Sequence, residues 1–259
     1  MPLTSAGIYL LATEHSEAIQ RLAADPAIAA TTRIPHPYPA DAARDFIAAQ
    51  IAAREKGSAW TFAILDRNEL VGVCGIEGLD HDDPPELGYW VGVPHWGKGY
   101  ATFAVKLVLE FAFKNLMLDR IRAHALEANA ASRRVLEKSG FAFLRLAPHY
   151  DAALGNLEQM VALYAISRTD WKEHRDGPAL ARLHPALRSI LDAELAAGND
   201  VAETGGGWPD PDSVFVRLVS PFRTRPEPLP TDLVYTEPND PHWWKADYSS
   251  RSPRHILAC

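Results

Sequence analysis

Residues 91–101 read Val91-Gly92-Val93-Pro94-His95-Trp96-Gly97-Lys98-Gly99-Tyr100-Ala101, an apolar strand that runs into a glycine-rich turn and then into a helix. Gly97 and Gly99 lack a Cβ atom, so the backbone there can take positive φ angles and approach a ligand closely. The first amides of the helix that follows have no partner within the helix and point beyond its N-terminus. This arrangement is suited to binding a phosphate group.

Three kinds of phosphate site fit this turn in part. Residues 92–98 match the P-loop pattern G-x-x-x-x-G-K, but the next residue is Gly99, where a P-loop needs a Ser or Thr to hold magnesium. The dinucleotide fingerprint G-x-G-x-x-G fits at Gly97 and Gly99 but has Thr102 in its third glycine position. The third kind is a pyrophosphate loop for coenzyme A. A purely structural turn is the plain alternative to all three.

The elements around this turn alternate between short apolar strands and amphipathic helices. Strands are predicted at 8–11, 60–65, 70–79, 86–93, 121–127, 141–146 and 159–165, and helices around 16–24, 43–51, 100–115 and 129–140. Strands interleaved with helices in this way indicate an α/β or mixed α+β domain. In the long helix, the residues predicted to face inward are Tyr100, Phe103, Ala104, Leu107, Val108, Phe111 and Ala112.

Two sequence signals mark the ends of the short helix at 129–140. Asn129 is a favoured N-cap residue, because its side chain can accept a hydrogen bond from a free backbone amide. Gly140 suits the left-handed position that ends a helix. The helix is therefore expected to begin after Asn129 and to end before Gly140.

Length and composition indicate a globular protein of one or two domains. The chain has 259 residues, of which 47% are hydrophobic and 23% charged, which is enough apolar material for a core. The composition changes near residue 168, since residues 169–259 hold more than half of the 20 prolines and four of the seven tryptophans. We therefore predict a first domain at 1–168 and a small α+β module at 169–259.

The second part matches no family from its sequence. Pro185 and Gly198 frame an amphipathic helix. Strands are predicted at 213–219, 233–236 and 255–258, and a loop at 205–211, formed by three glycines and the run Trp208-Pro209-Asp210-Pro211.

Charge and cysteine content argue against several classes of protein. Lysine plus arginine is 26 and aspartate plus glutamate is 33, giving a net charge of −7, which is the wrong sign for a general nucleic-acid binder. The only two cysteines, Cys74 and Cys259, cannot form a disulfide framework or a four-cysteine zinc site. His36 and His81, the histidines nearest the expected site, lack ligand spacing to another His or Cys, so no metal is expected.

The sequence also gives no sign of a membrane protein. No stretch approaches the roughly 18 consecutive apolar residues of a membrane span. Met1–Gly7 lacks the basic and apolar segments of a secretory signal. A cytoplasmic protein that does not contact the membrane is therefore expected.

Three motifs in order resemble the GNAT acetyltransferases, in particular the RimJ/RimL-like branch that acetylates N-terminal alanines of ribosomal proteins. The loop pattern R/Q-x-x-G-x-G/A of that family matches residues 96–101, with Trp96 in the first place. Residues 86–91 are similar to its central strand. Residues 129–141 are similar to its N-x-x-S…K-x-G-F segment. The resemblance covers about residues 7–167.

The resemblance implies a GNAT-like fold, with a central twisted mixed sheet flanked by helices, and acetyl-CoA as the co-substrate. It implies that the strand at 86–93 splays away from the strand at 121–127, so that free backbone groups pair with the pantetheine arm. The residues expected at the coenzyme site are Val91, Val93, Trp96, Gly97, Lys98, Gly99, Tyr100, Ala101, Asn129 and Ser132.

Acetyl transfer to an amine also needs a group that removes a proton, since an amine with an ordinary pKa of about 8–10 is mostly protonated at neutral pH. Glu86 is the first candidate because it begins the central strand beside the expected amine, and Glu77 on the neighbouring strand is the second. Many relatives place a tyrosine seven residues after the asparagine, where this chain has Leu136. Ser132 is the candidate donor to the leaving thiolate, with Tyr150 or a water as alternatives.

The predicted function is acetyl-CoA-dependent transfer of an acetyl group to a primary amine, by direct attack in a ternary complex. The amine is a protein N-terminus or a small molecule, attracted by the acidic loop at 80–86, with residues 33–38 shaping the acceptor side. Residues 169–259 are expected to influence acceptor choice or to form a homodimer. The alternative is a catalytically weak acetyl-CoA sensor or scaffold that contacts a partner through residues 169–259.

Overall fold

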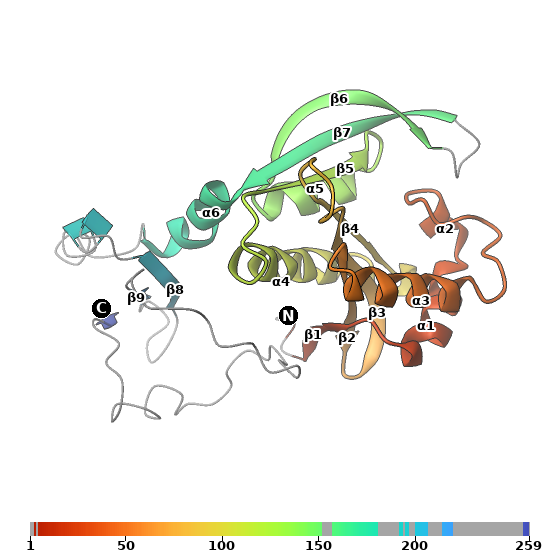
Figure 1. The fold of residues 1–259 in the computed structure, drawn as a ribbon, viewed down its shortest axis with the longest axis horizontal. Coiled ribbons are helices and arrows are strands. Elements are labelled where there is room, and N and C mark those ends of the chain that lie inside the picture. The colour runs from red at the N-terminus through yellow and green to blue at the C-terminus, as the bar shows by residue number, and fades with distance from the viewer. Residues whose placement is uncertain are drawn as a thin grey trace. The chain divides into compact units, whose positions relative to one another are not determined.

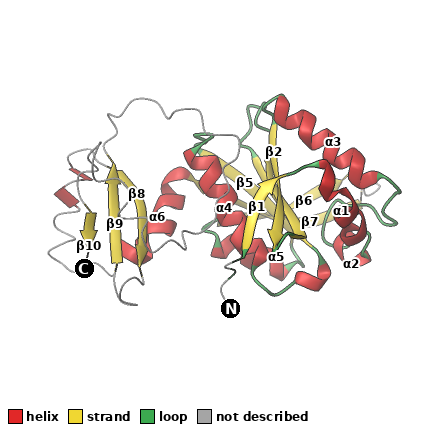
Figure 2. Ribbon diagram, turned by 90° about the horizontal axis from the view of Figure 1, so that it is seen from below, coloured by secondary structure: helices red, strands yellow, loops and turns green. Residues whose placement is uncertain are grey.

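The computed structural model describes residues 3, 5–151, 157–180, 192–193, 195–196, 200–206, 214–219 and 256–258. The chain divides into two compact units, Met1–Trp171 and Lys172–Cys259. Each unit contains a sheet of its own (Figures 1 and 2).

The first unit is built on a seven-stranded mixed sheet. Its strands are β1 (Ala6–Leu10), β2 (Ala59–Asp66), β3 (Glu69–Glu77), β4 (Glu86–Val91), β5 (Arg120–Leu126), β6 (Ala142–Asp151) and β7 (Leu157–Ser167). Their order across the sheet is β1-β2-β3-β4-β5-β7-β6. All neighbouring pairs are antiparallel except β4 and β5, which are parallel. The predicted mixed α/β architecture is confirmed.

Helices cover both faces of this sheet (Figure 2). They are α1 (Ser16–Ala23), α2 (Pro26–Ala29), α3 (Ala42–Glu55), α4 (Tyr100–Lys114) and α5 (Ala130–Lys138), with 3₁₀ turns η1 (Thr13–His15) and η2 (Val93–His95). A further helix, α6 (Arg168–Leu180), begins directly after β7. Helices α1 and α3 pack on β2 and β3 through a core that includes Ile19, Ile47 and Val73. Helix α4 packs on the other face through a second core that includes Val105 and Leu109.

The local signals predicted for α5 are confirmed. Asn129 is the N-cap, and its side-chain oxygen accepts a hydrogen bond of 3.0 Å from the Ser132 amide. Gly140 has a φ of 93°, in the left-handed region that ends a helix without strain only at glycine. These two ends fix where Ser132 lies in the first turn of α5.

The parallel strands β4 and β5 diverge after one point of contact. Their pairing has a single register pair, Glu86 with Arg122, where the Arg122 amide donates to the Pro85 carbonyl at 2.9 Å. Strand β4 continues to Val91 and is paired along its whole length with β3. The predicted splay of the two strands is therefore confirmed, although the strand expected at 86–93 ends at Val91.

The second unit holds a three-stranded antiparallel sheet of β8 (Asp200–Gly206), β9 (Val214–Val219) and β10 (Ile256–Ala258), in the order β10-β9-β8. The strands predicted at 213–219 and 255–258 correspond to β9 and β10. The loop predicted at 205–211 is wrong at its start, because Gly205 and Gly206 belong to β8, and its remaining residues lie outside the described ones. The predicted helix at 185–198 lies mostly, and the predicted strand at 233–236 entirely, outside the described residues.

At the predicted domain boundary near residue 168, helix α6 begins at Arg168 directly after β7, with no loop between them. The boundary between 168 and 169 itself stays a prediction. Among the described residues, no helix combines the length and apolar character that crossing a bilayer requires.

Candidate active site

The glycine-rich turn has the backbone geometry that its sequence predicts. Gly97 has a φ of 72° and Gly99 a φ of 90°, both in the left-handed region. Gly99 is the N-cap of α4, and its carbonyl accepts the Phe103 amide at 3.0 Å. The amides that precede Phe103 in the first turn of α4 point beyond the helix, together with its positive dipole end. Phosphate oxygens fit this arrangement.

Two of the expected coenzyme residues interact with each other. The Trp96 indole N–H donates to the Val91 carbonyl. The Gly92 amide donates to Val71 on β3 at 2.8 Å, and successive strand residues direct their backbone groups to opposite edges. The backbone of Val91 therefore faces the gap beside β5, where Trp96 already occupies its carbonyl.

Val93 does not extend the strand edge as predicted. It begins the 3₁₀ turn η2, and its carbonyl accepts the Trp96 amide at 3.2 Å. Proline at position 94 cannot donate a ladder hydrogen bond, which favours ending the strand here. The interpretation of Val93 as a strand position is wrong, while Val91 lies at the strand end as expected.

The Tyr100 side chain ties the start of α4 to the end of β2. Its hydroxyl donates to the Asp66 carboxylate. This hydrogen bond raises the pKa of Tyr100, and hydrogen bonds from Ser5 and Tyr100 lower the pKa of Asp66. Tyr100 therefore has only its backbone amide to offer the coenzyme, whereas the neighbouring Lys98 is exposed.

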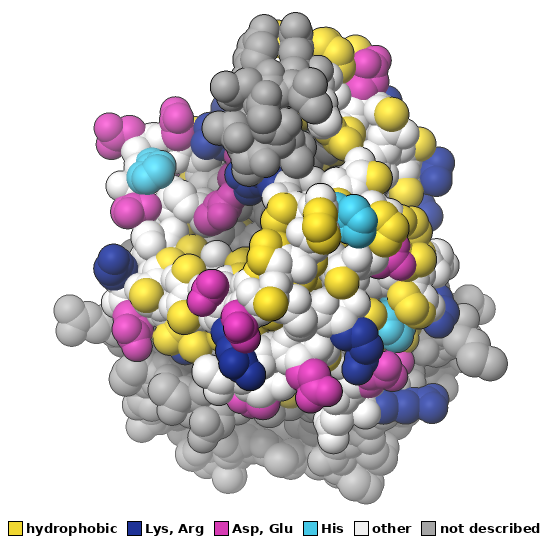
Figure 3. Space-filling view, turned by 90° about the vertical axis from the view of Figure 1, so that its right-hand side faces the viewer, with side chains coloured by type: hydrophobic (Ala, Val, Ile, Leu, Met, Phe, Trp, Pro, Cys, Tyr) yellow, Lys and Arg dark blue, Asp and Glu magenta, His cyan; other side chains and the backbone are white. Residues whose placement is uncertain are grey.

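A pocket of about 520 Å³ opens beside the gap between β4 and β5. Its lining combines β4 and β5 with the segment between α2 and α3, so the predicted acceptor segment does reach the pocket through Arg33, Ile34, Pro35 and Tyr38. At Gly88, in the middle of β4, an added Cβ would meet no atom within 4 Å. Figure 3 shows a face of the molecule on which hydrophobic and charged side chains border a hollow.

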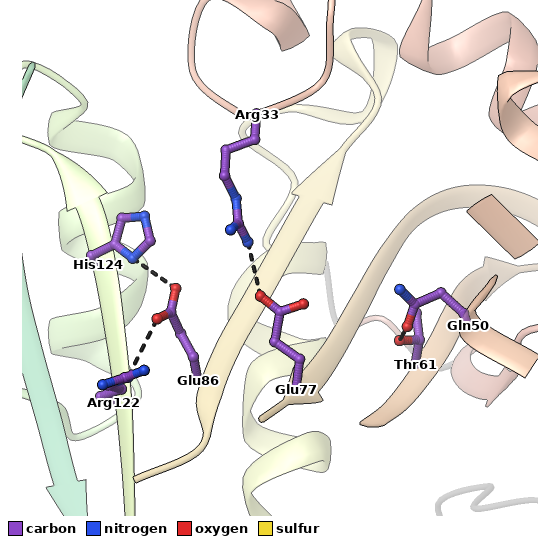
Figure 4. Close-up of polar contacts among 7 residues, drawn as sticks. All are labelled: Arg33, Gln50, Thr61, Glu77, Glu86, Arg122 and His124. Atoms are coloured by element: carbon purple, nitrogen blue, oxygen red, sulfur yellow. Dashed lines mark hydrogen bonds and ion pairs between the residues drawn. The ribbon is translucent and has the colours of Figure 1, made fainter. Parts of the chain in front are cut away.

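Glu86 lies in this pocket with both carboxylate oxygens engaged (Figure 4). Its Oε1 is 2.8 Å from His124 Nδ1, and its Oε2 is 3.4 Å from Arg122 Nε. Burial alone would raise the pKa of Glu86. The hydrogen bond from His124 and the charges of His124, Arg33 and Arg122 outweigh that effect and hold its pKa below the ordinary value. Glu86 is therefore ionised near neutral pH.

The second carboxylate candidate, Glu77, also lines the pocket. It forms an ion pair of 2.8 Å with Arg33, whose side chain is 56% exposed while that of Glu77 is 50% exposed. Exposed pairs of this kind contribute little to stability.

The pocket lining also holds a pair of hydroxyls, from Tyr89 and Ser132. Tyr89 Oη is 2.8 Å from Ser132 Oγ and donates to the Ser132 carbonyl at 3.1 Å. Burial raises the pKa of Tyr89, so the phenol keeps its proton. Leu136 is fully buried in the core, and the side chain of Tyr150 lies outside the described ones. Ser132 therefore meets a tyrosine, but one supplied by β4.

Two further expectations concern Cys74 as a nucleophile and a bound metal ion. Cys74 is fully buried on β3, and burial raises the pKa of its thiol. A buried protonated thiol is a core residue rather than a nucleophile. Over the described ranges, no three His, Cys, Asp or Glu side chains come together as metal ligands.

Sequence reasoning missed His124, Arg122 and Tyr89. His124 and Arg122 alternate on the strand β5, whose intervening residues are buried, so a polar stripe on one strand face was a usable signal. Tyr89 lies two residues before Val91 on the predicted central strand. Nothing in the sequence alone indicates that its hydroxyl reaches α5.

Fold and site together define a class of proteins in which a parallel strand pair opens beside a phosphate-binding turn. Residues 8–142, just over half of the chain, match the family model of the acetyltransferase (GNAT) domain. The chain belongs to the GNAT acetyltransferase family.

The relatives agree with this assignment. The chain is 34% identical over 118 residues to the uncharacterized N-acetyltransferase p20 of Bacillus licheniformis, covering 44% of this chain and 66% of that protein. Among solved structures, Mycobacterium smegmatis RimJ in complex with CoA-disulfide aligns with a TM-score of 0.59 and 22% identity, over 74% of this chain and 91% of that one. RimL, a ribosomal L7/L12 alpha-N-protein acetyltransferase in complex with coenzyme A, aligns with a TM-score of 0.57 and 18% identity, over 64% of this chain and 96% of that one. The structural matches show the fold, and the chain spans just under two thirds of p20.

Proposed function

We propose that the protein transfers an acetyl group from acetyl-CoA to a primary amine by direct attack in a ternary complex. One observation carries the proposal: β4 and β5 meet only at Glu86 and Arg122 and then diverge between the phosphate-binding turn and a pocket that contains a carboxylate. A thioester in that gap would lie beside an amine in the pocket.

One set of residues binds acetyl-CoA, and another set binds and deprotonates the amine. The amides at Gly97, Lys98, Gly99, Tyr100 and Ala101 hold the pyrophosphate of acetyl-CoA. The backbone of Val91 and the side chains of Asn129 and Ser132 border its arm. On the acceptor side, Glu86 and its partners receive the proton that the ammonium group must lose before the nitrogen attacks the carbonyl carbon. The C–S bond then breaks, and Ser132 donates to the sulfur.

A protein N-terminus or a small amine is the proposed acceptor. The names of RimL and RimJ structures and of a putative ribosomal N-acetyltransferase of Bacillus subtilis support an N-terminal amine. A spermidine N-acetyltransferase of Vibrio cholerae with the same fold supports a polyamine. The pocket carries Glu77 and Glu86, which favour a cationic amine of either kind. No feature of the described residues favours the sensor alternative.

The test begins with the shared premise, acetyl-CoA binding by calorimetry on the full chain. Release of free CoA is then measured with a panel of amines that includes Ala- and Ser-starting peptides and spermidine. Binding of acetyl-CoA with amine-dependent CoA release supports the proposal. If acetyl-CoA binds but no amine causes release of CoA, the proposed enzymatic function is wrong, and the alternative of an acetyl-CoA sensor or scaffold is favoured.

A further inference from the structure

Glu86 is not arranged to take the acceptor proton by itself. His124 occupies one carboxylate oxygen at 2.8 Å and Arg122 lies 3.4 Å from the other. An ammonium group that approaches either oxygen of Glu86 would therefore share that oxygen with His124 or Arg122. A carboxylate held ionised by such partners is also a weak proton acceptor, because its pKa lies below the ordinary range.

The contact fixes the protonation pattern of the imidazole. An ionised carboxylate only accepts hydrogen bonds, so the ring nitrogen that faces Glu86, Nδ1, carries a proton. In a neutral imidazole the other nitrogen, Nε2, then has the lone pair. Figure 4 shows this second nitrogen on the far side of the ring from Glu86. His124 itself lines the pocket, with 23% of its side chain exposed.

We propose that His124 Nε2 removes the proton from the acceptor ammonium and that Glu86 is the positioning residue that sets its tautomer. The inference rests on the proposed acetyl transfer and names its proton acceptor. The ammonium N–H bond breaks and an Nε2–H bond forms, so the amine becomes neutral and His124 becomes an imidazolium paired with Glu86. After transfer the imidazolium gives its proton to water.

The charged groups around the pair are consistent with this role. Arg122 lies on the same strand as His124 and is shared between Glu86 and Asp83, the latter at 3.6 Å. Arg33 faces the pair from the loop after α2 and is itself bound to Glu77. The charged groups around the imidazolium are therefore three carboxylates, of Glu86, Asp83 and Glu77, and two guanidinium groups, of Arg122 and Arg33.

The experiment compares the pH dependence of kcat/KM in the wild type, His124→Gln and Glu86→Gln, with the most active amine of the panel. In the wild type kcat/KM rises with pH as the base loses its proton. His124→Gln is expected to lower kcat/KM by about 10²–10⁴-fold and to remove this limb. Glu86→Gln is expected to keep the limb and move it to lower pH, because the imidazolium loses its counter-charge. The amine substrate titrates in the same way in all three assays, so differences between the pH profiles come from the enzyme.

The opposite pattern would overturn the proposal. If Glu86 were the base, Glu86→Gln would remove the limb, and His124→Gln would keep it and move it to higher pH. A limb unchanged in both variants would overturn it as well. His174→Gln on α6 controls for removing an imidazole elsewhere and should leave the profile unchanged.

A second readout does not depend on activity. Nitrogen-15 spectra of histidine-labelled protein without substrates, with the His124 signal identified by its loss in His124→Gln, should show Nδ1 protonated and Nε2 unprotonated at high pH. The reverse tautomer would overturn the proposal. A wild type with this tautomer that acetylates no amine would instead refute the proposed function, and with it the catalytic role, while leaving the Glu86–His124 geometry established.

Discussion

Tyr89 Oη on β4 lies 2.8 Å from Ser132 Oγ on α5. The pair joins the strand that borders the proposed acetyl-CoA arm to the helix that follows β5. The family resemblance implies a tyrosine seven residues after Asn129 in many relatives, and this chain has the buried Leu136 at that position. A phenol from β4 therefore stands next to the serine in its place.

Tyr89→Phe is expected to lower kcat by about 10–100-fold, below the full effect of an acid–base group because water can replace a donor in part. The affinity for acetyl-CoA should stay unchanged. Ser132→Ala should give a similar loss, and the double variant should be no worse than the single ones, since both act through one contact. Steady-state kinetics with calorimetry would measure this. Tyr9→Phe on β1 is the control, and additive losses would contradict the shared role.

The phosphate-binding turn offers a matched comparison between two glycines. Gly97 has a φ of 72° and Gly57 a φ of 74°, and an added Cβ at either would meet no atom within 4 Å. Alanine should therefore cost similar stability at both sites, about 1 kcal/mol for a left-handed residue. Only Gly97→Ala should weaken acetyl-CoA binding, because it moves the amides of the turn. Equal acetyl-CoA affinities for Gly97→Ala and Gly57→Ala would refute the assignment of this turn.

The sequence pattern was sufficient for the sheet and for the phosphate turn because both depend on local signals. Glycines, caps and apolar alternation act within a few residues, and they located β2 to β5, β7, α4 and α5 to within two residues. Strand β6 was predicted to end at residue 146 but continues to Asp151. The inner face of α4 was harder. Tyr100, Ala104, Val108 and Ala112 are buried as predicted, and Phe111 packs against the core. Phe103 and Leu107 are only partly buried, and the structure buries Val105, Leu109 and Phe113 instead. Helix α4 is apolar on nearly all sides, so periodicity cannot choose its face.

The candidate site was predictable only in part, for a different reason. Glu86 was found from its place at the start of the central strand. His124 is its partner only because β4 and β5 pair in parallel at one register position, Glu86 with Arg122, which are 36 positions apart in the sequence. Neither strand carries a signal for it. The contact of Tyr89 with Ser132 likewise depends on how β4 and α5 pack.

Gly88 should set the size of the acceptor entrance. It lies between Glu86 and Trp90 on β4, and open space surrounds the position of a Cβ. Gly88→Ala and Gly88→Val should raise the KM for the amine in that order, by filling the pocket beside the reacting nitrogen. The acetyl-CoA affinity should remain at the wild-type value, because the turn is distant along the strand. A KM for the amine unchanged in both variants would place the acceptor elsewhere.

The Glu86–His124 contact should also be visible as acid sensitivity of the fold. The folded-state pKa of Glu86 is depressed by its partners, so its contribution to stability is present above the ordinary glutamate pKa of about 4.3. The contribution is lost as pH falls through the lower folded-state pKa. Denaturant midpoints of the wild type should therefore exceed those of Glu86→Gln at pH 7, and the difference should shrink steadily below about pH 4.3. Glu77→Gln, which breaks only an exposed ion pair with Arg33, should show little difference at either pH. A Glu86→Gln variant as stable as the wild type at pH 7 would mean that burial of the carboxylate offsets everything its partners contribute.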